Sequence, residues 1–184
     1  DRQTPAAGVK RRGVGLASLI HVGGSGRIYR SDASGIILKL DDFGTVNVYY
    51  GGVEMGQGLH SALTLGIAER LGVRPEHVVI NPTDTGTCPW DVGTHASRGA
   101  FVALNAAIMA ADKARAKLFA LAEEIFPEEV GQALARHKQQ HPDYVLPDLD
   151  LRRAARREAF DLQDGVLRLR DAPDDPQLQL PLVR

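Results

Sequence analysis

The chain has little of several features that would assign it to a specialised class. It holds one cysteine, Cys88, in 184 residues, which excludes an internal disulfide framework and predicts a reducing compartment, the cytoplasm. No apolar run approaches the roughly 20 residues needed to span a bilayer. The formal net charge of −1 provides no field to attract nucleic acid or an anionic membrane. The remaining composition is that of an ordinary globular protein with one sizeable core.

The ends of the chain predict a piece of a longer protein. The sequence does not begin with methionine, and its first residues contain no apolar signal segment. We expect residues 1–12 to be a polar linker and residues 13–184 to be part of one domain. No internal repeat or long low-complexity tract divides this second part.

The order of apolar and turn-forming segments predicts an α+β fold. A hairpin signature, Asp41–Gly44, separates two β-rich runs, and apolar residues every four positions from Leu59 predict a helix that stops at Gly72. A second hairpin is expected to turn at Asp164–Gly165, before an edge strand over residues 178–182. Further strands are predicted at residues 14–22, 35–40, 45–50 and 77–80, and helices at 59–71, 100–126, 127–141 and 149–160. Because no regular β-α-β-α repetition is present, we expect a sandwich in which mixed sheets pack with two long helices.

Two glycine-bearing loops are the most informative features of the sequence. Residues 51–58 (GGVEMGQG) lie between a predicted strand and a predicted helix, and their four glycines allow backbone N–H groups to approach a ligand. Residues 84–99 (DTGTCPWDVGTHASRG) form a second small-residue loop that precedes the long alanine-rich helix, with Ser97 as its expected N-cap. Each loop leads directly into the N-terminus of a predicted helix. A helix N-terminus favours the binding of an anion such as phosphate. Two such loops could bind one extended anionic ligand from two sides.

Both loops resemble motifs of a known family. Residues 51–60 (GGVEMGQGLH) look like the pterin-cofactor motif in the large subunits of molybdenum hydroxylases, and residues 93–99 (GTHASRG) are similar to the second cofactor loop of the same subunits. That family includes xanthine dehydrogenases, aldehyde oxidases, nicotinate- and aromatic-CoA-type dehydrogenases and 4-hydroxybenzoyl-CoA reductase. The resemblance extends from about residue 12 to about residue 126, and more faintly through residue 165, and implies a molybdopterin-binding domain.

The resemblance implies a specific set of cofactor-binding residues. Gln57 is the first choice, because its amide can both donate and accept hydrogen bonds. Arg98 has two alternatives that stay open at this point: a bidentate contact to phosphate, or an ion pair with Asp84 or Asp91. The full expected set is Met55, Gly56, Gln57, Gly58, Ala96, Ser97 and Arg98.

Other polar residues near the loops are expected to have structural roles. Glu54 is predicted to tie its loop together rather than act as a base. His60 and His95 lack the spacing of metal ligands, and Cys88 has no histidine at a catalytic spacing. We therefore expect no catalytic residue and no metal ligand in this chain.

The resemblance also implies cofactors and partners. In the family, a pterin dithiolene holds molybdenum, and electrons pass through 2Fe-2S clusters and FAD on partner subunits or domains. In the family, the substrate is oxidised or, in one branch, reductively dehydroxylated. The loop sequences resemble those of bacterial relatives, which suggests a cytosine dinucleotide form of the pterin. The family's Gly-Phe-Gly-Gly loop, its segment carrying the glutamate base and its iron–sulfur cysteines are missing here. We therefore expect the chain alone to be inactive; the competing prediction is a non-redox module that binds a nucleotide or the phosphates of an acyl-CoA.

Overall fold

The first sheet is built on a tight hairpin. The structure is a computed structural model that describes residues 13–21, 23–24, 32–143, 150–151, 155–156, 159–170 and 175–181. Strands β1 (Ile36–Leu40) and β2 (Val46–Tyr50) pair antiparallel, as the sequence predicts. At the turn, the Asp41 carboxylate accepts hydrogen bonds from the backbone N–H groups of Phe43 and Thr45 at 3.0 and 2.9 Å. These bonds fix the turn and lower the pKa of Asp41, and the bond from Thr45 has the largest effect.

A helical crossover adds the third strand. Helix α1 (Leu59–Leu71) buries Leu59, Leu63 and Ile67 on the predicted face. It ends at Gly72, whose φ of 68° lies in the left-handed region that favours glycine. A 3-10 turn, η1 (Pro75–His77), then leads to β3 (Val78–Ile80), which pairs parallel with β2 to give the order β1-β2-β3.

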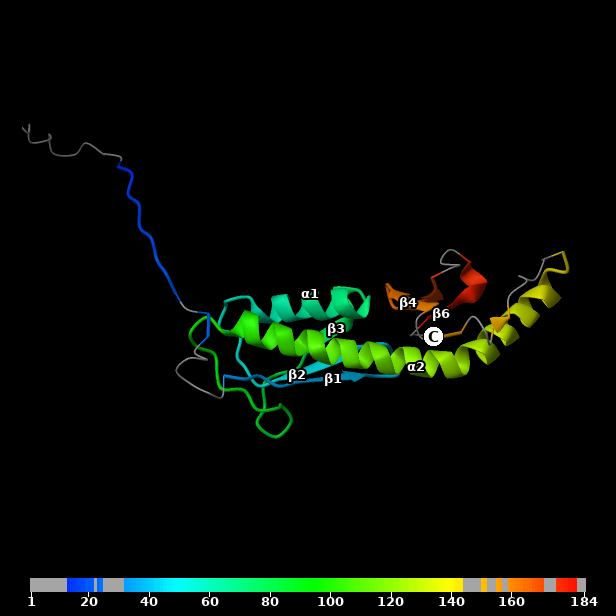
Figure 1. Cartoon of the computed structure of the whole chain (residues 1–184), viewed down its shortest axis with the longest axis horizontal. Helices are drawn as coiled ribbons and strands as arrows, with labels where there is room; N and C mark the ends of the chain where they lie inside the picture. Colours follow the sequence, from blue (N-terminus) through cyan, green and yellow to red (C-terminus); the bar gives the residue numbers. More distant parts are fainter. Residues whose placement is uncertain are drawn as a thin grey trace, which may run out of the picture.

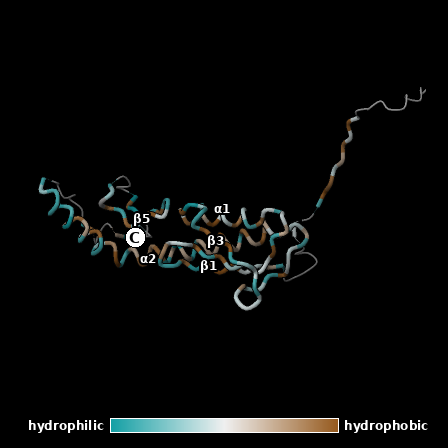
Figure 2. Tube along the Cα trace, turned by 180° about the vertical axis from the view of Figure 1, so that it is seen from behind, coloured by the Kyte–Doolittle hydropathy of each residue, from teal (hydrophilic) through white to brown (hydrophobic). Residues whose placement is uncertain are grey.

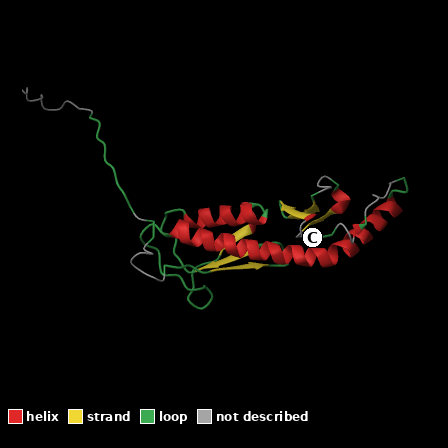
Figure 3. Cartoon of the chain, viewed as in Figure 1, coloured by secondary structure: helices red, strands yellow, loops and turns green. Residues whose placement is uncertain are grey.

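The long second helix differs from the prediction in length. Helix α2 runs from Gly99 to Gln140 without interruption, so the separate helix predicted at residues 127–141 is wrong. Pro127 lies inside α2 and does not end it, because Phe126 and Val130 on either side are buried and hold the helix against the second core. Figures 1 and 3 show α2 passing along α1 and then continuing to the far end of the molecule.

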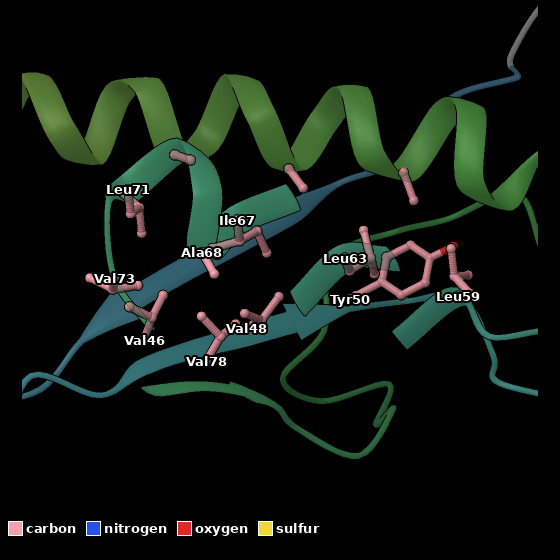
Figure 4. Packing of buried hydrophobic residues seen from close by; sticks show 13 residues of the cluster. Val46, Val48, Tyr50, Leu59, Leu63, Ile67, Ala68, Leu71, Val73 and Val78 are labelled. Atoms are coloured by element: carbon pink, nitrogen blue, oxygen red, sulfur yellow. The ribbon is translucent and has the colours of Figure 1, made fainter. Parts of the chain in front are cut away.

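Two hydrophobic cores lie along α2. In the first, alanines 103, 107 and 111 of α2 pack with α1 and with β2, whose Val46, Val48 and Tyr50 are seen in Figure 4. The second is formed by α2 with β4 (Phe160–Gln163), β5 (Val166–Leu169), the 3-10 turn η3 (Pro176–Leu178) and β6 (Gln179–Pro181). The predicted hairpin at Asp164–Gly165 joins β4 to β5, and β6 pairs with β5 as the predicted edge strand. Two small sheets packed with two helices confirm the α+β prediction.

Two predictions fall partly or wholly outside the described residues. Half of the residues in the helix predicted at 149–160 lie outside the described residues, and its last residue is wrong because Phe160 begins β4. The linker at residues 1–12 also lies outside them.

The predicted N-terminal strand does not form. Residues 13–21 have no strand partner among the described residues, and a strand requires one. Val14, Leu16, Leu19 and Ile20 are between 89% and 104% exposed, and Figure 2 shows this largely hydrophobic segment leading away from the rest of the molecule.

Candidate cofactor site

The two glycine-bearing loops meet at one pocket. The backbone N–H of Val53 donates to Thr94 Oγ1 at 2.9 Å, and the Thr94 hydroxyl donates to the Val53 carbonyl at 3.3 Å. This contact joins positions 41 residues apart in the sequence. The pocket between the loops has a volume of about 430 Å³. It is lined by Met55, Gln57, Gly58, Leu59, Ala62, Thr94, His95, Ala96, Ser97, Arg98, Gly99 and Ala100.

Six of the seven expected cofactor residues therefore share one cavity, and the seventh, Gly56, lies between two of them in the sequence. Gln57 and Ser97, which the motifs place 40 positions apart, line the same pocket. The two glycine-bearing loops therefore converge on one cavity.

Glu54 holds the first loop in place, as predicted. Its Oε1 accepts the N–H groups of Gly56 and Gly58 at 2.8 and 3.0 Å, and its Oε2 accepts the N–H of His60 at 2.9 Å. The bond from His60, followed by that from Gly58, lowers the pKa of Glu54. The backbone N–H groups at the start of α1 are thus bound by the Glu54 carboxylate. They do not form the anion-binding site that the glycine-rich loop predicted.

Gln57 stiffens the same loop. Its Oε1 accepts the N–H of Met55, and its Nε2 donates to the Val53 carbonyl at 2.8 Å. The side chain is nonetheless exposed and lines the pocket. Both of these bonds are to backbone atoms of its own loop.

The second loop enters α2 through two left-handed residues. Ala96 and Ser97 have φ values of 48° and 51°, a conformation that costs a non-glycine residue about 1–3 kcal/mol and concentrates at functional sites. The Gly24 N–H donates to the Ala96 carbonyl at 2.7 Å and helps to hold this geometry.

The prediction that Ser97 caps α2 is wrong. The N-cap residue is Arg98, without a side-chain cap, because the left-handed backbone of Ser97 places that residue outside the cap position. The first turn of α2 carries no acidic residue either. The start of α2 therefore opens into the pocket at Gly99 and Ala100 with no side-chain acceptor of its own.

Arg98 is the buried centre of the second loop. Its guanidinium pairs with Asp32 through Nε and with Asp91 through Nη1 at 2.9 Å. Nη1 also donates to the Gly93 carbonyl, and Nη2 donates to the Ala33 carbonyl. The side chain is fully buried.

This network decides between the two sequence alternatives for the Arg98 side chain. The ion pair with Asp91 is present, and the guanidinium is fully buried among its protein partners. Burial alone would lower the pKa of Arg98, but the hydrogen bonds and charges of Asp32 and Asp91 outweigh burial and raise it. Arg98 reaches the pocket next to Ser97 while its side chain binds the loops behind it.

Tyr50 lies beneath the first loop. A Cβ placed on Gly52 would lie 2.0 Å from the Tyr50 hydroxyl, so the glycine loop crosses directly over the ring. Burial raises the pKa of Tyr50, and the charge of Asp91 adds to this effect. The absence of a side chain at Gly52 is required by packing as well as by backbone freedom.

The other His, Cys, Asp and Glu side chains of the described residues do not form a metal-binding cluster. Among the described residues, no group of three or more His, Cys, Asp or Glu side chains could hold a metal ion. The Cys88 thiol is half-buried and accepts the Asp84 N–H at 3.4 Å.

In the part of the chain that the structure describes, no helix has the length and apolar character needed to cross a membrane.

Sequence reasoning missed two residues that shape the site. Thr94, whose hydroxyl joins the loops, was visible only as part of the second motif. Asp32 lies 66 positions from Arg98, and no local pattern connects the two.

Comparison with known proteins identifies the class. The model of the molybdopterin cofactor-binding domain matches residues 1–165, so the chain belongs to that family. It is 35% identical to the xanthine dehydrogenase molybdenum-binding subunit of Escherichia coli O157:H7 over 111 residues, which are 60% of this chain and 15% of that subunit. It is 30% identical over 154 residues to the subunit gamma of the 6-hydroxypseudooxynicotine dehydrogenase complex of Paenarthrobacter nicotinovorans, covering 82% of this chain and 18% of that subunit.

The fold is similar to that of a solved structure. The crystal structure of quinoline 2-oxidoreductase from Pseudomonas putida 86 aligns with a TM-score of 0.55 and 22% identity, over 81% of this chain and 15% of that chain. The chain thus spans less than a fifth of the length of each of these proteins.

Proposed function

We propose that the pocket between the two loops binds the molybdopterin cofactor of a xanthine dehydrogenase-family molybdenum oxidoreductase. The observation that carries the proposal is the convergence of residues 51–58 and 93–99 on one cavity of about 430 Å³. Its lining combines small residues, an amide side chain and the uncapped start of a helix. These groups suit an organic, anionic cofactor, whereas the described residues offer no cluster that would bind a metal directly.

The residues around the pocket have distinct roles in this proposal. Gln57 offers an amide to the pterin edge or a phosphate, and Met55 packs on the ring system. Ala96 and Ser97 have small side chains, so their backbone atoms just before α2 can approach the cofactor closely. The positive end of α2, which has no acidic residue in its first turn, favours the negative charge of a phosphate.

When bound, the cofactor supplies molybdenum and the redox chemistry. The chain's own residues bind and orient the pterin: Glu54 fixes the first loop, and the Arg98 network fixes the second. We expect no base from this chain, so the chain alone should be inactive.

The similarity to larger subunits extends the proposal to the whole protein. We infer that the chain is part of a cytoplasmic large subunit that oxidises, or reductively dehydroxylates, an aromatic, heterocyclic or aldehyde substrate. The expected partners are the rest of that subunit and iron–sulfur and flavin subunits or domains carrying 2Fe-2S clusters and FAD. A cytosine dinucleotide is the expected form of the pterin.

The test is metal and pterin analysis of the complete protein that contains this chain. We expect molybdenum and a pterin nucleotide, and loss of most of both from Gln57→Ala. Gln139→Ala removes the same amide from the exposed far end of α2 and should retain both. An active protein without molybdenum would overturn the proposal, and a retained nucleotide or acyl-CoA in its place would establish the non-redox module.

A further inference from the structure

Tyr50, the last residue of β2, has a buried hydroxyl without a hydrogen-bond partner in the part of the chain that the structure describes. Its ring packs in the first core with Leu59 and Leu63, and the residue is only 1% exposed (Figure 4). A buried oxygen that makes no hydrogen bond has lost its bonds to water without replacement, which is unfavourable and uncommon in native proteins. The Tyr50 hydroxyl therefore requires an explanation.

Two further oxygen atoms of this kind belong to Ser34 and Asp91. Among the described residues, Ser34 Oγ and Asp91 Oδ2 are buried and have no hydrogen-bond partner. Ser34 and Asp91 form an isolated antiparallel β-bridge, and the side chains of opposed residues lie on the same face of such a pair. The hydroxyl of Ser34 and the carboxylate of Asp91 are therefore neighbours.

Tyr50 is close to both of these residues. Burial has the largest effect on its pKa and raises it, the charge of Asp91 raises it further, and the charge of Arg98 and the hydroxyl of Ser34 lower it. The backbone next to Tyr50 also approaches Asp91, because a Cβ on Gly51 would lie 3.1 Å from the Asp91 Cβ. The three oxygen atoms without partners thus belong to one region of the molecule.

The three groups also match in their capacity to donate and accept. Tyr50 and Ser34 each carry one O–H donor, and the Ser34 oxygen can accept a bond while it donates another. Asp91 Oδ2 is a carboxylate oxygen, which accepts only. A series of bonds from Tyr50 through Ser34 to Asp91 gives each of the three oxygen atoms a partner.

We propose that the Tyr50 hydroxyl donates to Ser34 Oγ and the Ser34 hydroxyl donates to Asp91 Oδ2, which makes Tyr50 and Ser34 positioning residues of the second glycine-bearing loop. Neither residue lines the pocket, and both act through Asp91. The other oxygen of that carboxylate, Oδ1, accepts the Gly93 N–H at 2.7 Å and the Arg98 Nη1–H at 2.9 Å. A bond to Oδ2 fixes the plane of the carboxylate and hence both groups that Oδ1 binds.

The consequence for the cofactor rests on the proposed function. Arg98 is the N-cap residue of α2 and lines the pocket together with Ser97 and Gly99. A carboxylate held in one orientation keeps Arg98, and with it this part of the loop, in the geometry that binds the pterin. The Tyr50–Ser34–Asp91 network therefore slows release of the cofactor.

Amide hydrogen exchange of the 184-residue chain tests the network without any cofactor. Ser34→Ala removes the direct donor to Asp91, so the Gly93 N–H should exchange about five- to tenfold faster, the effect of losing one ordinary hydrogen bond. Tyr50→Phe should have a smaller effect alone and no further effect in the Ser34→Ala background, because the link to Asp91 is then already lost. Tyr49→Phe is the matched control: it removes the same hydroxyl from the opposite face of β2 and should leave Gly93 unchanged.

Any of the following exchange results would overturn the network. The Gly93 rate could be unchanged in Ser34→Ala, or the two substitutions could multiply their effects as independent sites do. Tyr49→Phe could accelerate Gly93 as much as Tyr50→Phe does. Equal acceleration of the β1–β2 amides would show a general loss of stability in place of a local one.

Cofactor release from the complete protein that contains this chain tests the positioning role. We expect Ser34→Ala to lose pterin about fivefold faster than the original protein during dialysis, and Tyr49→Phe to match the original. Equal release from Ser34→Ala and the original would overturn the positioning role. An original protein without pterin would overturn the proposed function and the positioning role with it, whereas the exchange experiment still decides whether the network exists.

Discussion

The Arg98 guanidinium and the Asp91 carboxylate form an ion pair of 2.9 Å in which both side chains are fully buried. The pair lies behind the pocket and joins α2 to the second glycine-bearing loop. Asp32 adds a second carboxylate from a distant part of the chain. The geometry of the second loop therefore depends on a buried charge cluster.

Arg98→Met should strongly destabilise the fold. Removing one member of a buried ion pair leaves uncompensated charge and costs about 3–5 kcal/mol of unfolding free energy. Urea denaturation measures this change. Arg70→Met is the matched control, because Arg70 pairs with Asp112 at a half-exposed site, where a pair contributes about 0–1 kcal/mol. Equal losses for the two variants would contradict the role given to the Arg98 network.

Glu54→Gln should change the pH dependence of stability. The pKa of Glu54 is lowered in the folded state, so its carboxylate contributes stability above the ordinary value of 4.5, and this is lost as pH falls through the lower folded pKa. A glutamine cannot accept three N–H groups in the same way. The unfolding midpoint of the original chain should exceed that of the variant at neutral pH and approach it in acid.

Glu124→Gln is the control for loss of charge, because Glu124 lies on an exposed face of α2. Thermal unfolding of the three proteins across a pH series makes the comparison. A difference between Glu54→Gln and the original chain that stays constant into acid would show that the carboxylate does not bind the loop as described.

Gly52→Ala should disrupt the support of the first loop. The added Cβ would overlap the Tyr50 ring, and overpacking of this kind costs about 1–3 kcal/mol. Gly131→Ala makes the same substitution within α2, where the nearest atom is 3.8 Å away, and should stabilise by up to about 1 kcal/mol. Opposite shifts in urea denaturation midpoints are expected; a neutral Gly52→Ala would show that Tyr50 moves freely.

Pro127→Ala should stabilise the C-terminal half of α2. Proline lacks the N–H that would bond to the carbonyl of residue 123, and its removal from a helix interior can contribute up to about 3 kcal/mol. Hydrogen exchange over residues 123–140 should slow, while exchange over residues 99–114 should remain unchanged. Slower exchange in both ranges would indicate one cooperative unit instead of two cores.

Local patterns predicted much of the fold. Turn formers at Asp41–Gly44 and Asp164–Gly165 act on their nearest neighbours, and both hairpins formed as expected. The four-residue apolar spacing and Gly72 set the extent of α1. The two loop motifs predicted a shared pocket because each precedes a helix start. The two turns and the end of α1 depend on interactions within a few residues of each other, whereas the shared pocket joins Val53 to Thr94, 41 positions apart.

The features that the sequence did not predict depend on distant contacts. The continuation of α2 through Pro127 follows from burial of Phe126 against Phe160, with ring centroids 5.1 Å apart. Asp32 joined Arg98 only through folding. The misplaced cap at Ser97 follows from its left-handed backbone, which the Gly24 contact at Ala96 helps to hold.

Alanines 103, 107 and 111 allow α1 and α2 to lie close together, and this affects the pocket from a distance. Both helices begin at the pocket, where a Cβ on Gly99 would be 3.1 Å from Leu59. Their dipoles are therefore parallel neighbours that repel each other. Glu54 neutralises the end of α1, and the end of α2 is left with a field that attracts an anion. Close packing of the two helices thus brings both helix N-termini to the same pocket, one bound by Glu54 and the other with no acidic residue in its first turn.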